Sequence, residues 1–278
     1  MSDFGPSDQL VHSIQQGEGA PVVLIHGVAA SIFDWIDLSP DLVGADYAVY
    51  ALDLLGHGKS IKPKDLKEYN VGRVFEHFES WLRSLGFDSP LILVGHSLGG
   101  YLAMEYALRF PEKVRALVLV DPFYCLEQLS PLLRFHYKRP LINLGLISYA
   151  PEWLIRLSIE LTGLFIRNGY IAPQTKAARA QTAQDYKRAS PGIYNILSTA
   201  RDLTPDLPKV TAPTLVAWGK HDQSLSPRSF ETLAAALPNA QTAVIDSGHV
   251  PHQSHPAELN RHVLAFLQAV TTSEEKLR

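Results

Sequence analysis

Residues 91–104 read Leu91-Ile-Leu-Val-Gly95-His-Ser97-Leu-Gly99-Gly-Tyr-Leu-Ala-Met104. This stretch is an apolar strand pattern, then G-x-S-x-G, then a helical pattern, which is the context that a nucleophile elbow requires. Such a turn strains the backbone of its serine, and small residues at Gly95 and Gly99 let strand and helix approach closely. The pattern predicts that Ser97 is a nucleophile presented at the edge of a sheet. The structural alternative is a serine that only caps the following helix.

A serine hydroxyl is a weak nucleophile at neutral pH, so Ser97 needs a general base, and that base needs an acid to fix its tautomer. In this architecture the expected chain order is serine, acid, histidine, with each partner in a loop after a later strand. Asp222 and His249 each follow an apolar run and fit this order. A turn aspartate and a surface histidine are the structural alternatives, and Asp121, which also ends a strand, is a rival acid.

The oxyanion of a tetrahedral intermediate needs prearranged donors, each contributing roughly 3 to 4 kcal/mol. The backbone N–H of Leu98, directly after the nucleophile, is one expected donor. The backbone N–H of Val28, in the loop after the early apolar run, is the other. This chemistry requires no cofactor.

Three histidines near the C-terminus, His249, His252 and His255, form an H-x-x-H-x-x-H series. Neighbouring Gly and Pro residues interrupt a regular helix there, and no carboxylate or cysteine completes a ligand set. We therefore expect no metal site.

Short runs rich in β-branched residues recur along the chain, and their apolar character on both faces is typical of buried parallel strands. Longer segments with helical spacing lie between them. This alternation predicts an α/β fold with a doubly wound, mostly parallel sheet, in which ligands bind at the carboxyl ends of the strands. The predicted strands are 22–25, 48–52, 91–94, 116–120, 214–217 and 242–245, and the predicted helices are 74–85, 98–110, 227–237 and 256–270.

The alternation stops after Asp121 and resumes only at residue 214, a gap too long for a simple loop. We expect residues 1–122 and 205–278 to form the core, with residues 123–204 as a helical cap inserted after the sixth strand. Helical patterns punctuated by Pro and Gly support this cap; they cover residues 132–137, 153–161 and 176–187.

Charge is distributed unevenly between the two parts. Residues 125–200 contain nine Lys or Arg and four Asp or Glu, a balance of +5, which leaves −8 for the rest of the chain. A basic, apolar cap would suit anionic substrates or contact with a membrane surface, and solvated faces of short helices explain the same charges.

Composition excludes several classes of protein. A net charge of −3 over 278 residues does not provide the concentrated basic face of a nucleic-acid binder. The single Cys125 excludes an intramolecular disulfide, and the first residues lack a secretory signal, so we expect a cytoplasmic protein. No apolar run approaches the roughly 20 residues that cross a bilayer. The oligomeric state is left open, and residues 271–278 are expected to form a frayed tail.

Together these features resemble the α/β-hydrolase superfamily, particularly its capped branch of esterases and carbon–carbon bond hydrolases. Residues 26–35 look like the family's oxyanion loop, residues 53–60 like its second signature and residues 248–251 like its histidine loop. The resemblance covers nearly the whole chain and implies the α/β-hydrolase fold. Relatives that act on epoxides or haloalkanes have an aspartate at the nucleophile position, so Ser97 argues against both activities.

The expected activity is that of a carboxylesterase, which works by acyl transfer to serine and then to water. We expect a small-molecule ester with an apolar portion, enclosed by aromatic residues of the cap; these are Phe135, Tyr137, Trp153 and Phe165.

Two alternatives to ester hydrolysis remain. One is carbon–carbon bond hydrolysis of a diketone-type substrate, which the same catalytic triad of Ser97, His249 and Asp222 supports. Val250, His96 and Ala29-Ala30 depart from the residues often found in that branch and weaken this alternative. The other alternative is a non-catalytic ligand receptor on the same fold, which an intact triad disfavours.

Overall fold

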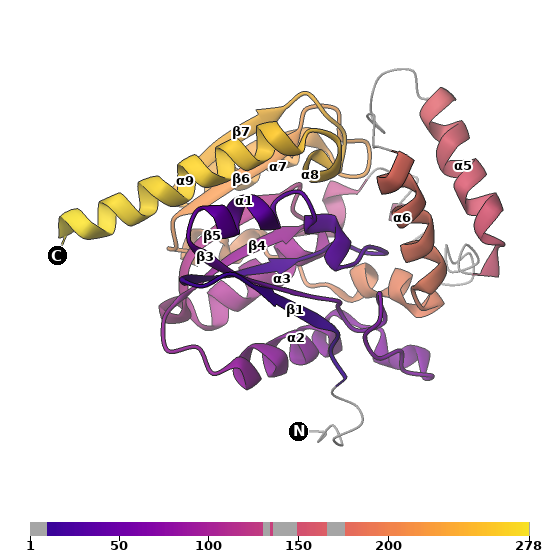
Figure 1. The fold of residues 1–278 in the computed structure, drawn as a ribbon, viewed down its shortest axis with the longest axis horizontal. Coiled ribbons are helices and arrows are strands. Elements are labelled where there is room, and N and C mark those ends of the chain that lie inside the picture. The colour runs from indigo at the N-terminus through magenta and orange to yellow at the C-terminus, as the bar shows by residue number, and fades with distance from the viewer. Residues whose placement is uncertain (1–9, 130–133, 136–148, 166–175, 278) are drawn as a thin grey trace.

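The computed structural model describes residues 10–129, 134–135, 149–165 and 176–277 (Figure 1). Its centre is a seven-stranded sheet with the order β1-β3-β2-β4-β5-β6-β7. The pairing of β1 with β3 is antiparallel and every other pairing is parallel, which confirms the predicted fold class. The strands are β1 (Ser13–Gln16), β2 (Ala20–Ile25), β3 (Tyr47–Leu52), β4 (Leu91–His96), β5 (Val114–Val120), β6 (Thr214–Gly219) and β7 (Ala240–Ile245).

Helices cover both faces of this sheet. The α-helices are α1 (Ser39–Gly44), α2 (Val71–Leu85), α3 (Leu98–Arg109), α5 (Glu152–Phe165), α6 (Lys176–Arg188), α7 (Pro227–Ala236), α8 (Pro251–Ser254) and α9 (Pro256–Leu277). The 3-10 helices are η1 (Ile32–Trp35), η2 (Leu66–Glu68), η3 (Pro111–Lys113), η4 (Leu126–Gln128), η6 (Pro191–Thr199) and η7 (Thr204–Lys209).

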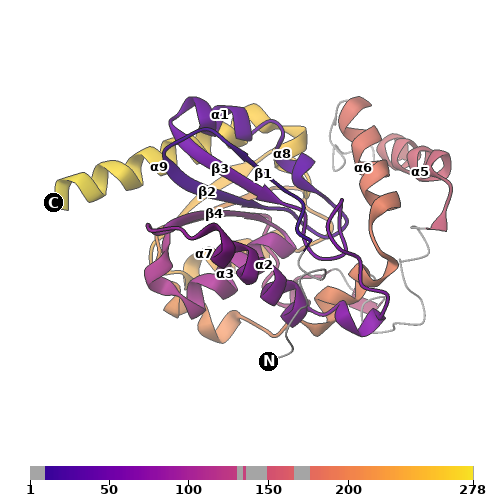
Figure 2. The same ribbon diagram turned by 60° about the horizontal axis from the view of Figure 1, so that its bottom comes forward.

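The core lies in two apolar clusters, one on each face of the sheet. Successive strand residues point to opposite faces, so a strand buried on both sides divides its side chains between the clusters. In β2, Val23 and Ile25 belong to the cluster formed with α2, α3 and α7, and Val22 and Leu24 belong to the cluster formed with α1 and α9. Figure 2 shows these two helical layers on either side of the sheet.

All six predicted strands are present, and the sequence analysis missed a seventh, β1. Its sequence, Ser-Ile-Gln-Gln, is mostly exposed and pairs only with β3 at the edge of the sheet. A polar edge strand lacks the apolar run that marks the buried strands. The inserted segment was expected after the sixth strand, whereas in the structure it follows β5, the fifth strand of the described residues.

The prediction of a frayed C-terminal tail is wrong, because α9 continues to Leu277. Arg115, on β5, anchors this end of the helix to the sheet. Its Nη2 donates to Glu274 Oε2 at 2.8 Å and to Thr271 Oγ1 at 2.9 Å. A local sequence pattern does not reveal a partner so distant in the chain.

Between β5 and β6 the structure places η4, α5, α6 and η6. The helices α5 and α6 confirm two of the helices expected there, and most of the third, residues 132–137, lies outside the described residues. Figures 1 and 2 show α5 and α6 beside one end of the sheet, with α6 nearer to the core. In the described part of the chain, no helix has both the length and the apolarity needed to cross a membrane.

Asp185 of α6 is buried where this segment meets the core. Gln181 Nε2 donates to its Oδ1 at 2.9 Å. Burial raises the pKa of Asp185 to about 7, and the nearby carboxylates of Asp34 and Asp53 also raise it. At neutral pH the inserted segment therefore meets the core through a carboxyl group close to its titration point.

We expect Asp185→Asn to change how stability depends on pH. An unfolded aspartate loses its proton near pH 3.8, whereas folded Asp185 keeps it to about pH 7, so wild-type stability should fall as pH rises through this window. The variant should lack the loss of stability that ionisation of Asp185 causes. Its melting temperature should exceed that of the wild type at about pH 8 but not at about pH 4. Thermal unfolding across this range is the measurement, with exposed Asp88→Asn as the control. Parallel pH profiles for wild type and Asp185→Asn would contradict a raised pKa.

Candidate active site

Ser97 occupies the turn between β4 and α3, with φ 50° and ψ −111°. A residue with a side chain adopts this left-handed conformation only at a cost in strain, which the surrounding structure must offset. The Ser97 N–H donates to Val120 O at 3.1 Å, and the Ser97 carbonyl accepts from Phe123 at 3.0 Å and Tyr101 at 3.2 Å. The strained turn is thus held by β5, by α3 and by the start of the inserted segment.

Strand and helix come very close around this turn. A Cβ on Gly95 would lie 2.3 Å from Gly99 O, and a Cβ on Gly99 would lie 2.0 Å from Ile25 O. Both distances are far shorter than a van der Waals contact, so only glycine fits without moving the backbone. The expectation that small residues are needed at both positions is confirmed.

Asp222 and His249 are joined by a hydrogen bond, with His249 Nδ1 2.7 Å from Asp222 Oδ2. Asp222 follows β6, and its Oδ1 accepts from the N–H groups of Ser224 at 2.7 Å and Leu225 at 3.0 Å. Both carboxylate oxygens therefore act as acceptors, which makes His249 Nδ1 the donor and leaves a lone pair on Nε2. The Asp222 side chain is fully buried and the His249 side chain is partly exposed.

Asp121, the rival acid, lies in the same group but is placed differently. One oxygen of Asp121, one of Asp222 and one ring nitrogen of His249 all lie within 4.8 Å of one another. Burial raises the pKa of Asp121 well above its ordinary value, and the charge of Asp222 raises it further. Its Oδ1 accepts from Gly219 N–H at 3.0 Å. Asp222, and not Asp121, is the acid that hydrogen-bonds to the histidine ring.

His96, the residue before Ser97, contacts the histidine loop directly. Its Nε2 lies 2.8 Å from the backbone oxygen of His249. A carbonyl oxygen only accepts, so Nε2 carries the hydrogen. Burial lowers the pKa of His96 well below its ordinary value, as do the neighbouring His252 and His249. A neutral ring therefore connects the nucleophile strand to the loop of the base, a role that the sequence did not reveal.

A second buried polar cluster lies beside this contact. Asp34 Oδ2 is 3.8 Å from His96 Nδ1 and 3.6 Å from His252 Nε2, and Asp34 Oδ1 accepts from Gln253 Nε2 at 2.6 Å. Two sets of side chains among the described residues have metal-ligand spacing. One is Asp34, His96 and His252, and the other is Asp121, Asp222 and His249. Among the described residues, the rings of His249, His252 and His255 do not all belong to one such set.

The two expected oxyanion donors lie on segments that meet at Ser97. A Cβ on Gly27, the residue before Val28, would lie 3.3 Å from Ser97 Cβ, so this loop packs against the turn. Leu98 begins α3, where first-turn N–H groups lack helical acceptors. Within the described ranges, neither the Val28 N–H nor the Leu98 N–H donates to a protein acceptor. Their role in binding an oxyanion stays a prediction.

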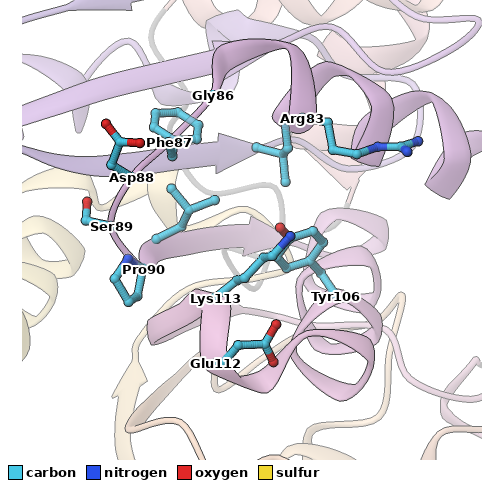
Figure 3. Close-up of a pocket in the computed structure, with 11 residues that line it drawn as sticks. Arg83, Gly86, Phe87, Asp88, Ser89, Pro90, Tyr106, Glu112 and Lys113 are labelled. Atoms are coloured by element: carbon cyan, nitrogen blue, oxygen red, sulfur yellow. The ribbon is translucent and has the colours of Figure 1, made fainter.

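A separate hollow of about 360 Å³ lies away from these residues (Figure 3). Leu91, the first residue of β4, lines it, whereas Ser97 follows the last residue of that strand. The hollow therefore lies at the amino ends of the strands, opposite the edge where open parallel sheets bind ligands. The labelled residues around it are Arg83, Gly86, Phe87, Asp88, Ser89, Pro90, Tyr106, Glu112 and Lys113.

Comparison with known proteins relates this site to a large group of enzymes. The family model described as the alpha/beta hydrolase family matches residues 22–262. The chain is 26% identical over 264 residues to the 2-hydroxy-6-oxo-6-(2'-aminophenyl)hexa-2,4-dienoic acid hydrolase of Metapseudomonas resinovorans, which covers 91% of this chain and 86% of that enzyme.

Two solved structures are similar over almost the whole chain. A thermophilic esterase from Thermogutta terrifontis matches with a TM-score of 0.74 and 25% identity, over 94% of this chain and 93% of that one. A bacterial membrane phospholipase A matches with a TM-score of 0.74 and 28% identity, over 94% of this chain and 83% of that one.

Two neighbouring variants test the raised pKa of Asp121. Asp121→Asn keeps an acceptor for Gly219 and removes a group that is harder to ionise in the folded state. Its stability relative to wild type should rise with pH above about 4, because the unfolded wild type releases a proton that the folded state retains. Asp222→Asn, which takes a carboxylate away from three donors, should be less stable than wild type at neutral pH. Urea unfolding over a pH series measures both, and an unchanged pH slope in Asp121→Asn would refute the raised pKa.

Proposed function

The chain belongs to the alpha/beta hydrolase family, and we propose that it is a serine hydrolase that cleaves carboxylic esters through an acyl-enzyme. The observation that carries this proposal is the 2.7 Å hydrogen bond between Asp222 and His249. It occurs in a fold that holds Ser97 on a strained turn at the end of a central strand. An acid, a base and a presented hydroxyl are the groups that acyl transfer to serine requires.

In the first step, Ser97 Oγ attacks the ester carbonyl while His249 Nε2 takes the hydroxyl proton. Nε2 suits this role because Nδ1 is already donating to Asp222. The carboxylate of Asp222 then stabilises the imidazolium that forms. The carbonyl oxygen becomes an oxyanion, which the N–H groups of Val28 and Leu98 receive.

Collapse of this intermediate breaks the ester bond, and His249 gives its proton to the departing alcohol. A water molecule next attacks the acyl-enzyme as His249 takes one of its protons. The second intermediate releases the carboxylic acid, and the proton returns to Ser97. The protein's own groups supply every proton transfer in this sequence.

The proposed substrate is a small-molecule ester with an apolar portion. Support comes from the similarity to an esterase and a phospholipase, both of which act on esters. The expectation that cap aromatics enclose the substrate needs revision, because Trp153 and Phe135 are 65% and 46% exposed. Tyr137 lies outside the described residues, and Phe165 is the last residue of α5. The proposal keeps the reducing cytoplasm as the place of action, in line with a single buried Cys125.

Carbon–carbon bond hydrolysis is the second candidate, favoured by the 26% identity to the dienoic acid hydrolase over 91% of this chain. The same triad serves both reactions, so the pocket decides between them. Turnover of p-nitrophenyl esters compared with turnover of a vinylogous diketone separates the two, and a higher kcat/KM for the diketone would replace the ester proposal.

Ser97→Ala should lower kcat for p-nitrophenyl esters by about 10⁶-fold, and Asp222→Asn should lower it by about 10⁴-fold, since nucleophile and orienting acid act as one unit. A fluorophosphonate probe should label the wild type and not Ser97→Ala. Ser84→Ala, on the far side of α2, is the control and should behave as wild type. Full esterase activity in Ser97→Ala would refute the mechanism, and failure of the wild type to label would support a non-catalytic receptor.

A further inference from the structure

The inserted segment exposes large apolar side chains together at the start of α5. Tyr149, Trp153, Leu154 and Leu157 are 73%, 65%, 43% and 45% exposed, and we name these four residues the α5 patch. Leu157 is four residues from Trp153 and three from Leu154, so these three side chains share one face of the helix. A cluster of this kind marks an interaction surface rather than isolated surface residues.

The side of the helix opposite the α5 patch packs inward, because Ile155, which points away from the α5 patch, is buried. The ion pair of Glu152 and Arg156 separates the two apolar sides. Figures 1 and 2 both show α6 between α5 and the sheet, so α5 is the outermost element on this side. A buried residue thus lies on one side of α5, and the exposed α5 patch lies on the other.

The α5 patch lies in a segment of net positive charge, although α5 itself carries Glu152 and Glu160 besides Arg156. Arg156 lies on the same helix and pairs with Glu152 at 2.6 Å. Lys187 of α6 is exposed and donates to the carbonyl of Ala150 at 3.0 Å, directly beside Tyr149. The +5 balance of residues 125–200, against −8 for the remainder of the chain, means that an anionic surface attracts this end of the molecule and repels the rest. Such an asymmetry orients the protein as well as attracting it.

We propose that the α5 patch docks on the surface of an anionic lipid bilayer. Tryptophan and tyrosine favour the boundary between headgroups and acyl chains, and leucine inserts just below it. A short apolar face within a segment of net positive charge is typical of a segment that lies in this interface and does not span it. Docking delivers lipid-soluble esters to the inserted segment, a consequence that rests on the proposed function, whereas docking itself rests on the surface alone.

Intrinsic fluorescence gives a direct readout of docking. Of the four tryptophans, Trp35, Trp81 and Trp218 are buried and Trp153 is exposed. Mixing the full chain with phosphatidylglycerol-containing vesicles should shift the emission to the blue, and vesicle flotation should recover the protein with the lipid. Pure phosphatidylcholine vesicles should bind more weakly, and added salt should weaken binding to the anionic vesicles.

Substitutions distinguish vesicle binding through the α5 patch from nonspecific binding by other exposed apolar residues. Trp153→Ser with Leu157→Ser should weaken partitioning into anionic vesicles by about 10- to 100-fold, because two large side chains no longer leave water. Leu66→Ser is the matched control, since Leu66 is 55% exposed but lies in η2 of the core; it should bind as wild type. Absence of wild-type binding, or equal loss in the control, would overturn the proposal. So would a concentration-dependent dimer that the double variant abolishes without any vesicle binding, because the α5 patch would then contact a second copy.

Activity measurements keep docking distinct from catalysis. The double variant should hydrolyse a soluble p-nitrophenyl ester as fast as wild type but should lose turnover of an ester embedded in anionic vesicles. Ser97→Ala should bind vesicles normally and hydrolyse neither ester. Normal hydrolysis of both esters by Ser97→Ala would remove the proposed function and leave docking intact. Equal turnover of the embedded ester by wild type and double variant would refute delivery from the bilayer.

Discussion

The left-handed backbone at Ser97 is the constraint on which the rest of the site depends. A φ of 50° at a residue with a side chain persists only where the neighbouring chain fixes it. Here the N–H of Ser97 binds the end of β5, and its carbonyl binds both α3 and Phe123, at the entry to the inserted segment. These backbone hydrogen bonds therefore fix the position of the nucleophile, the turn between β4 and α3, and the point where the inserted segment leaves the sheet.

Three buried carboxyl groups differ in their surroundings. Burial and the charge of Asp222 raise the pKa of Asp121. Asp222 accepts three hydrogen bonds and contacts the histidine. Burial alone would raise the pKa of Asp53, but the charge of His26 and backbone donors such as Lys59 N–H outweigh it and lower that pKa. Neighbouring charges and hydrogen-bond donors, together with burial, thus distinguish these acids.

The sequence predicted the parts of the molecule that depend on local pattern. Buried strands follow from β-branched runs, and the turn at Ser97 follows from two glycines that lack room for a Cβ. Contacts between distant segments left no such signal: the link from His96 to the His249 carbonyl spans 153 residues. The sequence also did not show whether an apolar helix face is buried or exposed, because apolar residues at helical spacing fit both cases equally. Trp153 was therefore expected around a substrate and is found 65% exposed.

The proposed catalytic residues lie in the core of the chain, and the exposed face of α5 lies in the inserted segment. The core groups are tied to one another by buried hydrogen bonds, and a shift of one disturbs its neighbours. The inserted segment joins the main apolar cluster through residues such as Ile193 and Leu197, buries Asp185, and carries the exposed face of α5. An esterase, a dienoic acid hydrolase and a phospholipase are each 25% to 28% identical to this chain. Since these proteins differ in substrate, similarity at this level measures the shared core, and selectivity must be sought in the insertion and in the surface that presents substrate to it.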